Sequence, residues 1–394
     1  MAGAAAAVSP PVEKADATAW IAVAAGALGA MLATLDISIV NSALPTIQGE
    51  IGATGTEGTW IATAFLVAEI IIIPLSAWLE RLLGLRTLLI VAVSAFTAFS
   101  VLCGIATDLT TMIIGRTGQG FMGGALIPTA MTIVAKRLPP SQQPIGMALF
   151  GMTVVLGPVM GPLVGGWLTE NLSWHYAFFV NVPVCALLLA LLFIGLPHEK
   201  PDWVYLREAD WAGIAGMILG LGGLTIVLEE GHREEWFDST LIVQLTLMTV
   251  VGFALLTYGQ LYARKPVLKL RLMLSRQFAS VVVMALALGM VMYGSTYVIP
   301  QFLAIISDYN ALQTGLVIFW MGVPAFLLMP VLPFMIRRIH IRIAVGAGMF
   351  IMALSCFVSI NLTAESGGGV FTESQFLRGI GMILTMMFLN QATV

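Results

Sequence analysis

Long apolar runs separated by short polar stretches make up the chain from about residue 19 onward. Most of these runs reach the roughly 20 residues that a helix needs to cross a bilayer, and Pro, Gly or charged residues bound them. The pattern therefore predicts about twelve membrane-spanning helices. We expect them at 19–43, 58–79, 87–106, 110–134, 145–168, 175–196, 211–229, 240–262, 278–300, 313–335, 342–361 and 375–394.

The composition excludes a soluble domain. Of the 394 residues, 59% are hydrophobic and only 10% are charged, whereas soluble domains carry about 25% charged residues. A net charge of −3 offers no basic surface for nucleic acid. The three cysteines, Cys103, Cys185 and Cys356, lie inside apolar runs without the spacing of a metal site. No phosphate-binding Gly-rich motif is present either, so we expect no cofactor, no metal and no enzyme.

The distribution of basic residues predicts the orientation. Nearly all of the 18 Lys and Arg residues fall in the polar segments that share a side with the N-terminus. The exceptions are Arg116 and Arg378, which lie within apolar runs, and Arg233, which lies in an outer loop. By the positive-inside rule, we expect residues 1–18 to form the cytosolic tail of a multi-pass membrane protein. The outer loops are acidic, which reflects either tolerated translocation of acids or a funnel for cations.

Ionisable residues inside apolar runs carry most of the functional information, because each is costly in a membrane unless it is paired or hydrated. Asp36 lies in the first predicted helix, Glu69 in the middle of the second, and Arg116 opens the fourth. Glu69 has no basic residue on its own helix. We predict that Asp36, Glu69 and Arg116 couple transport to protons; the alternatives are a static Asp36–Arg116 ion pair and a neutral Glu69 held by hydrogen bonds. Arg378, followed by Gly379 and Gly381, repeats the arginine–glycine arrangement at Arg116 and suggests an internal repeat.

The fifth predicted helix carries a regular pattern of small residues and prolines. Glycines spaced four apart allow another helix to pack backbone to backbone, and the prolines bend the helix. We predict a gating role for this surface, against the alternative of a tight static contact. The residues are Gly157, Pro158, Gly161, Pro162, Gly165 and Gly166.

Four stretches resemble one protein family. Leu35–Pro45, Arg116–Gly124 and Gly157–Gly166 resemble the first-, fourth- and fifth-helix motifs of the major facilitator superfamily, and Gly231–Ser239 resembles a loop of its tripartite-pump branch. The chain is thus identified as a member of the drug:proton antiporters with fourteen helices, the EmrB/QacA-like group. The resemblance implies an all-α integral membrane protein with two six-helix bundles and two extra central helices.

The chain departs from the family pattern in two places. Arg81 stands where the loop after the second helix should have Asp, so we expect a shifted charge cluster of Glu80, Arg81 and Arg86 there. With about twelve spans instead of fourteen, we also expect a truncated C-terminus. The implied division is a tail (1–18), an N-terminal bundle (19–196), linkers with the two extra helices (197–277) and an incomplete C-terminal bundle (278–394).

The resemblance also implies the function: proton-coupled export of lipophilic, often cationic compounds, including drugs, by a secondary active transporter. Two alternatives stay open, namely a specific exporter of a metabolite, siderophore or lipid, and a truncated, non-transporting remnant or assembly subunit. The expected partners are small lipophilic substrates, protons and membrane lipids, with a periplasmic adaptor (membrane fusion) protein and an outer-membrane channel implied by the loop alone. Candidate substrate-binding residues, at plausible cavity positions, are Asn41, Phe65, Glu69, Tyr293, Tyr297, Gln301 and Trp320.

Overall fold

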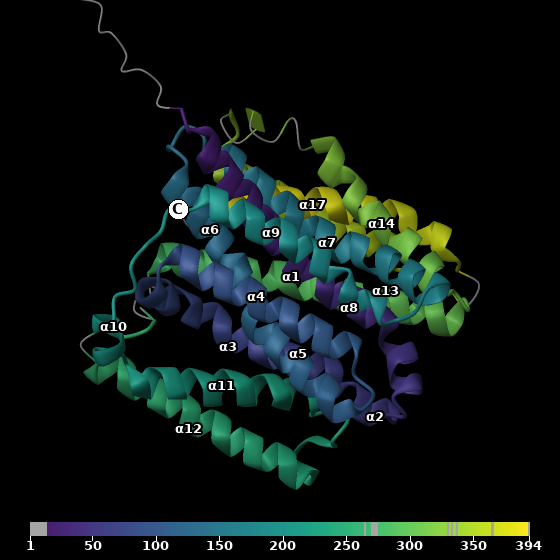
Figure 1. The fold of residues 1–394 in the computed structure, drawn as a ribbon. Coiled ribbons are helices and arrows are strands. Elements are labelled where there is room, and N and C mark those ends of the chain that lie inside the picture. The colour runs from purple at the N-terminus through teal and green to yellow at the C-terminus, as the bar shows by residue number, and fades with distance from the viewer. Residues whose placement is uncertain are drawn as a thin grey trace, which may run out of the picture.

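The computed structural model describes residues 14–263, 265–268, 275–328, 331, 334–335, 338–363 and 366–392. Within them every regular element is a helix (Figure 1). The first bundle contains α1 (Ala17–Glu50), α2 (Gly55–Gly58), α3 (Trp60–Leu83), α4 (Leu85–Gly104), α5 (Leu109–Gly123), α6 (Leu126–Arg137), α7 (Gln143–Asn171), α8 (Tyr176–Phe179) and α9 (Asn181–Gly195). The remaining helices are α10 (Val204–Arg207), α11 (Trp211–Glu230), η1 (Trp236–Asp238), α12 (Thr240–Tyr262), α13 (Arg276–Ile306), α14 (Ala311–Leu328), α16 (Ile341–Val358), η3 (Gly368–Val370) and α17 (Phe371–Ala392).

Within the described residues, each predicted apolar segment overlaps with helix, which confirms an all-α membrane protein. Nine helices among the described residues are long and apolar enough to cross a bilayer. The predicted segment 110–134 is divided into α5 and α6 at Gly124, where α3 approaches so closely that a Cβ on Gly124 would lie 2.6 Å from Ile72 Cγ2. The last part of segment 313–335 lies largely outside the described residues, and α14 ends at Leu328.

Helix starts follow ordinary capping chemistry. Asp16 caps α1 by accepting a hydrogen bond from the Ala19 N–H at 2.8 Å. Hydrogen bonds from the Thr18 hydroxyl and the Ala19 amide lower the pKa of Asp16. Asp108 caps α5 in the same way through the Thr111 N–H at 2.9 Å. Short polar residues thus set the start of these two helices.

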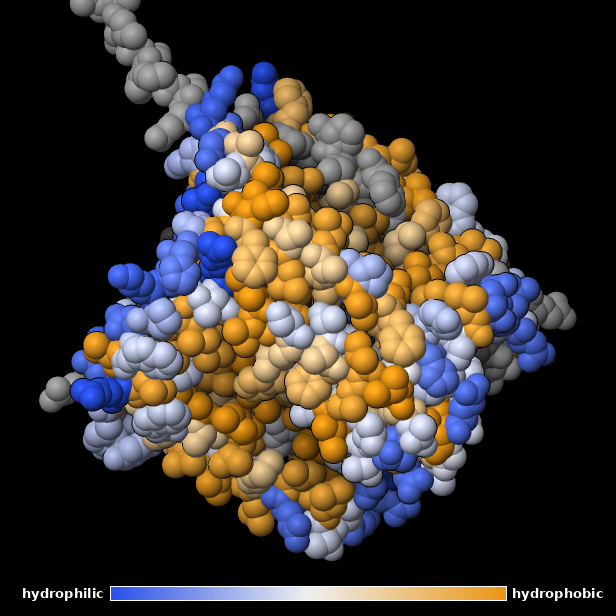
Figure 2. Space-filling view, in the orientation of Figure 1, coloured by the Kyte–Doolittle hydropathy of each residue, from blue (hydrophilic) through white to orange (hydrophobic). Residues whose placement is uncertain are grey.

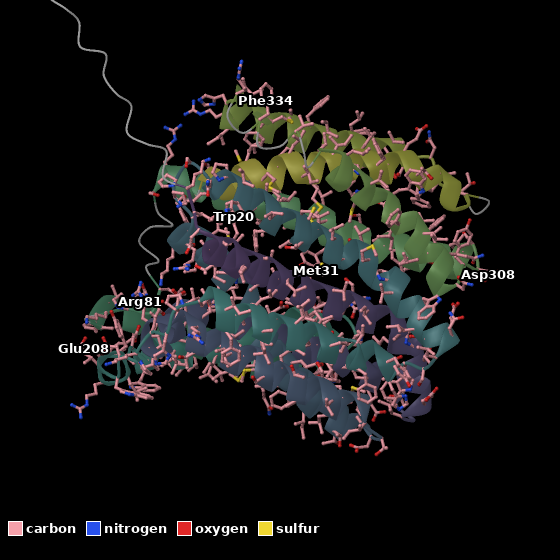
Figure 3. All side chains as sticks on the ribbon, turned by 45° about the horizontal axis from the view of Figure 1, so that its top comes forward. Trp20, Met31, Arg81, Glu208, Asp308 and Phe334 are labelled. Atoms are coloured by element: carbon pink, nitrogen blue, oxygen red, sulfur yellow. The ribbon has the colours of Figure 1, made fainter. Side chains whose placement is uncertain are left out.

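The surface has the form expected for a protein embedded in lipid. In the space-filling view, hydrophobic side chains cover the middle of the molecule and polar ones gather at its two ends (Figure 2). Arg81 and Glu208 lie at one of these ends and Asp308 at the opposite end (Figure 3). This separation agrees with the predicted alternation of loops across a membrane.

The helices form three groups in space (Figure 1). The α11–α12 pair flanks α3, on the side of the first bundle away from α14 and α17. Glycines allow close contact within the pair, since Gly220 and Gly252 face each other across it. A buried hydrogen bond of 2.8 Å from the Thr63 hydroxyl to Glu230 Oε1 joins α11 to α3. The extra pair is therefore fixed to the helix that carries Glu69.

The turn between α3 and α4 differs from the charge cluster that the sequence suggested. Glu80 pairs with Lys136 of α6, at 2.7 Å between Oε1 and Nζ, and not with Arg81 or Arg86. Gly84 adopts φ +80°, a backbone conformation that glycine tolerates best. The first amide of α4, at Leu85, donates a 2.6 Å hydrogen bond to Glu199 Oε2 of the following linker. Partners from distant segments explain the error, because sequence neighbours alone do not reveal them.

Candidate functional site

Asp36 of α1 and Arg116 of α5 form an ion pair in the interior of the first bundle. Arg116 Nη1 lies 2.7 Å from Asp36 Oδ2, and the two side chains are 1% and 0% exposed. A lone charge at this depth would be strongly unfavourable, whereas a paired and hydrogen-bonded one is tolerated. The structure thus brings together two of the three residues predicted to couple protons.

Amide and hydroxyl groups from three further positions complete the network around Asp36. Asn181 Nδ2, at the start of α9, donates to Asp36 Oδ1 at 2.6 Å, and Gln119 Nε2 donates to the same oxygen at 3.3 Å. Both amides also donate to Ser100 Oγ of α4, at 3.2 and 2.8 Å respectively. All three side chains are fully buried. The carboxylate is therefore solvated by protein groups from α5 and α9 as well as by Arg116.

Arg116 is held on its other side by α3. Its Nε donates to the Ile61 carbonyl at 3.2 Å, and its guanidinium carbon lies 4.2 Å from the centre of the Phe65 ring. This distance suits a cation–π contact. Phe65 was predicted to contact substrate; its ring is fully buried and faces Arg116. Its visible role is to support the arginine.

One buried atom in the network has no partner. The carbonyl oxygen of Asn181 makes no hydrogen bond within the described part of the chain, although the amide nitrogen makes two. A flip of this amide would present the carbonyl to Asp36 as an acceptor. Asn181 is thus equipped to bind either the ionised or the protonated form of the carboxyl group.

Glu69 lies six residues beyond Thr63 on α3 and is partly exposed. Within the described residues its carboxylate accepts no hydrogen bond, but it interacts electrostatically with Arg116 and Asp36. Tyr293 of α13 lies within electrostatic range of Glu69. Glu69 is therefore an accessible acid, linked by charge to the buried pair and near a helix of the second bundle.

The other predicted substrate contacts are more dispersed. Asn41, Tyr293, Gln301 and Trp320 are exposed on α1, α13 and α14, and none of them hydrogen-bonds to the buried network. The side chain of Tyr297 lies outside the described residues. Trp320 lines a cavity of about 420 Å³ between α14 and α17, together with Thr372, Glu373, Phe376 and Leu377.

The glycine pattern of α7 is a packing surface for α1. A Cβ added at Gly157, Gly161 or Gly165 would overlap with Thr34, Ser38 or Ser42, respectively. These three residues, spaced four apart, follow the face of α1 that lies opposite Asp36. Gly166 is buried, while Pro158 and Pro162 are partly buried. These three glycines, called the glycine stripe below, thus form the contact surface of α7 for α1, the helix that carries Asp36.

Another face of α7 meets the second bundle. A Cβ on Gly322 of α14 would lie 2.6 Å from Val159 Cγ1, and one on Gly315 would lie 3.1 Å from the Leu163 amide nitrogen. A Cβ on Gly151 would overlap with Met387 of α17. Helix α7 therefore touches α1 and the second bundle at once, which is the position that a gate between bundles requires.

The packing around Arg378 is similar to that around Arg116, but in a different register from the one that the sequence suggested. A Cβ on Gly120 would overlap with the Phe65 carbonyl, and one on Gly379 with the Met321 carbonyl, so these two glycines hold corresponding places. Arg378 precedes Gly379 and thus corresponds to Gln119, while Gln375 corresponds to Arg116. Arg378 Nη1 donates to Gln375 Oε1 at 2.7 Å. The arginine and glutamine have exchanged positions, and among the described residues no acid pairs with Arg378.

Sequence reasoning missed three members of the network. Gln119 follows Arg116 by three residues, so its place on the same helix face was a usable signal. Asn181 interrupts an apolar run, which marks a buried polar residue with a partner. Ser100 carried no signal, because serines in apolar helices commonly bond to their own backbone.

Comparisons with known proteins agree with this geometry. Residues 26–394 match the family model of the Major Facilitator Superfamily. The multidrug export protein EmrB of Escherichia coli (strain K12) is 32% identical over 370 residues, which are 93% of this chain and 72% of that protein. The fatty acid resistance protein FarB of Neisseria gonorrhoeae is 31% identical over 386 residues, 98% of this chain and 75% of that protein.

A solved structure shares the fold. The structure of a POT family transporter in complex with a thioalcohol conjugated peptide matches with a TM-score of 0.66 at 15% sequence identity. The match covers 95% of this chain and 83% of that one. The arrangement of helices is therefore one that solved transporters also have.

Proposed function

Because the chain belongs to the Major Facilitator Superfamily of secondary transporters, we propose that it exports lipophilic, often cationic compounds in exchange for protons. The observation that carries the proposal is the buried Asp36–Arg116 pair, joined by charge to the accessible Glu69. Relatives that cover most of the chain are named for multidrug export and fatty acid resistance. They support a substrate with a large apolar part.

Asp36 is the proton carrier in this proposal. Protonation removes its charge and releases Arg116 from a 2.7 Å ion pair. Arg116 retains its contacts to Ile61, Gln119 and Phe65, so it need not leave the site. Asn181 then accepts a hydrogen bond from the protonated carboxyl group through the carbonyl that has no partner in the ionised state.

Glu69 is the substrate-facing acid. Glu69 and Arg116 lie within electrostatic range of each other. A cationic compound beside the Glu69 carboxylate therefore also repels Arg116. Substrate and proton thus change the same charge network, which is what coupling between two ligands requires. Tyr293, exposed on α13 within electrostatic range of Glu69, supplies an aromatic ring for a lipophilic cation.

The structural change would pass through α7. This helix seats α1 on its glycine stripe and touches α14 and α17 on another face. A shift of α1 on changing the protonation of Asp36 would therefore reach the contact between bundles. Pro158 and Pro162 each remove one backbone hydrogen bond of α7 and make bending less costly.

The protein is a multi-pass membrane protein, and we place it in a bacterial inner membrane with a cytosolic N-terminus. A periplasmic adaptor and an outer-membrane channel complete the proposal. The loop that joins α11 to α12 supports it by its exposed aromatic residues, Trp236 and Phe237. Glu235 and Trp236 there adopt positive φ angles, a strained backbone that often marks a recognition site.

An efflux panel tests the proposed function. The full-length protein is expressed in cells that lack other pumps, and efflux of lipophilic cations, neutral lipophiles and long-chain fatty acids is compared. Energy-dependent efflux of several chemically unrelated lipophiles supports the proposal. Efflux of fatty acids alone would favour the specific exporter, which the similarity to FarB makes the second candidate. Efflux of none of them would contradict both.

A further inference from the structure

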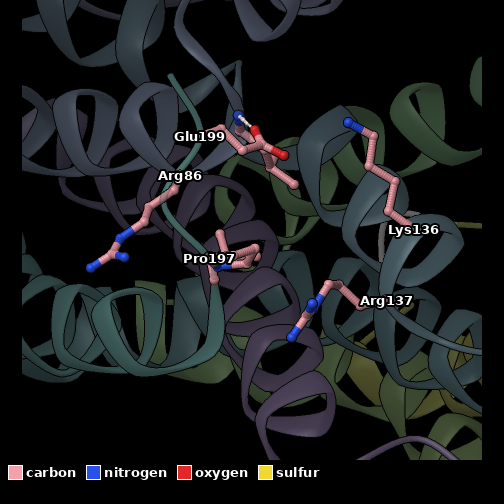
Figure 4. Close-up of a pocket in the computed structure, with 7 residues that line it drawn as sticks. Arg86, Lys136, Arg137, Pro197 and Glu199 are labelled. Atoms are coloured by element: carbon pink, nitrogen blue, oxygen red, sulfur yellow. Dashed lines mark hydrogen bonds between the residues drawn. The ribbon is translucent and has the colours of Figure 1, made fainter. Parts of the chain in front are cut away.

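A small basic pocket lies at one end of the first bundle, outside the transport site. It encloses about 320 Å³ between the start of α4, the end of α6 and the linker that follows α9. Figure 4 shows Arg86 on one side of it, Lys136 and Arg137 on the other, and Pro197 and Glu199 between them. Leu85 and Leu196 complete its wall.

The charges of this pocket are not balanced. Three cations line it against one carboxylate, Glu199, and that carboxylate already accepts a hydrogen bond from the Leu85 amide. Glu80 neutralises Lys136 from outside the pocket. Arg86 and Arg137 form no salt bridge within the described part of the chain. The pocket therefore has positive charge available for an anion.

Both arginines are positioned by neutral groups. Arg137 Nη2 donates to the Gly195 carbonyl and to Thr18 Oγ1, both at 3.3 Å, while its buried Nε has no hydrogen-bond partner. Asp16 also attracts Arg137, but it is fully solvent-exposed, and water screens that attraction. The guanidinium of Arg86 lies 5.5 Å from the centre of the Phe193 ring of α9. These contacts fix the two charged groups and leave donor atoms unused.

An apolar strip continues from the pocket along α9. Leu187, Ala190, Phe193 and Ile194 are all exposed, and their spacing of three to four residues places them on one helix face. Helix α9 belongs to a segment long and apolar enough to span a membrane. This strip therefore faces acyl chains, and Phe193 links it to Arg86 at the pocket.

We propose that this pocket binds the phosphate headgroup of an anionic phospholipid whose acyl chain lies along the exposed strip of α9. A membrane protein meets anionic lipids mainly at the cytosolic surface, where basic residues attract them. The pocket lies at the end of the helices that carries Arg81 and Glu208, the cytosolic end in the proposed orientation. The lipid would hold together α4, α6 and the linker that runs from α9 toward α11. Its binding does not depend on what the protein exports.

Native mass spectrometry of the full-length protein tests this site, with phosphatidylglycerol as the anionic probe and phosphatidylcholine as the zwitterionic one. We expect one phosphatidylglycerol to bind more tightly than phosphatidylcholine. Replacing both arginines (Arg86→Gln with Arg137→Gln) should weaken phosphatidylglycerol about 25-fold, on the scale of about five-fold for each basic residue at an anionic surface, and leave phosphatidylcholine unchanged.

Arg338→Gln is the matched control. Arg338 also lies over an exposed phenylalanine, Phe334, at 5.2 Å, but lines no part of the pocket. Its replacement should leave the tight lipid in place. Substituting both pocket arginines by Lys keeps the charge and should retain the preference for phosphatidylglycerol, which separates charge loss from misfolding. Equal lipid binding by the double Gln variant would overturn the proposal, as would displacement of the lipid by equimolar glycerol phosphate, which would indicate a soluble phosphate ligand.

Discussion

At the scale of single residues, the main feature is a fully buried carboxylate, that of Asp36. Asp36 receives hydrogen bonds from Arg116, Gln119 and Asn181, so its charge is stabilised by fixed dipoles and one cation. Three donors suit the ionised carboxylate of Asp36. Their arrangement must change when this carboxylate takes up a proton. Buried acids in transporters are therefore sites where a proton can drive a structural change.

Replacing Asn181 tests whether the amide groups around Asp36 contribute to the stability of the protein. Asn181→Ala removes the 2.6 Å hydrogen bond to Asp36 and leaves one carboxylate oxygen poorly satisfied. Unfolding free energy should fall by about 1–3 kcal/mol, the usual penalty for an unsatisfied buried polar group. Asn171→Ala is the control, because Asn171 is exposed and, among the described residues, donates only to the Trp167 carbonyl. Thermal unfolding in detergent measures both, and equal shifts would show that the buried bond contributes little.

Glu69 separates substrate recognition from structure. Glu69→Gln keeps the size of the side chain and removes its charge, and within the described chain the carboxylate has no hydrogen bond to lose. Affinity for lipophilic cations should fall about ten-fold, whereas neutral substrates should bind as before, since only cations use the charge. Competition for efflux by cationic and neutral compounds measures the difference. An equal loss for both classes would assign Glu69 to structure.

At the scale of helices, close packing through glycine determines which elements move together. Helix α7 contacts α1 through Gly157, Gly161 and Gly165, and no larger residue fits there. The sequence predicted this stripe because its spacing of four is visible without a structure. It did not predict the partner, nor the break between α5 and α6 at Gly124, because both depend on where α1 and α3 come to lie.

Gly161→Ala tests the contact between α7 and α1. The new methyl group would overlap with Ser38, so α1 and α7 must separate, and transport should fall at least ten-fold. Gly346→Ala, in α16, is the control, because open space surrounds that position. Adding Ser38→Gly to Gly161→Ala removes the overlapping Cβ and should restore much of the activity. No rescue, measured by efflux at equal protein levels, would show that the stripe acts in another way.

At the scale of the whole molecule, sequence periodicity was sufficient to locate the helices, whereas nine of the twelve predicted spans meet the length and hydropathy of a membrane span within the described residues. Hydropathy identifies spans because a bilayer demands about 20 apolar residues in each. The buried network was harder to predict. Asp36 and Arg116 stood out as charges in apolar runs, whereas Ser100 carried no signal and the partners of Asn181 became visible only once α9 was packed beside α1 and α4. The register of the repeat also needed the structure, since Gln375 and Arg378 exchange the positions of Arg116 and Gln119.

The orientation of the molecule gives a direct prediction. Glu208 and Asp308 lie at opposite ends (Figure 3). In a variant without the native cysteines, Asp308→Cys should react with a membrane-impermeant maleimide in intact spheroplasts, whereas Glu208→Cys should react only after permeabilisation. Both positions are exposed, so accessibility within the protein does not limit the reaction. The opposite labelling pattern would place the N-terminus outside.

The central claim is that Asp36 exchanges a proton for substrate, and proton release measures this most directly. Inside-out vesicles containing the full-length protein or its Asp36→Asn variant are loaded with a proton gradient, and a lipophilic cation is added outside. The account predicts substrate-dependent proton release by the protein and none by the variant, while the exposed Asp108→Asn control, which keeps a side chain able to cap α5, releases protons normally. Undiminished proton release by Asp36→Asn would contradict the account.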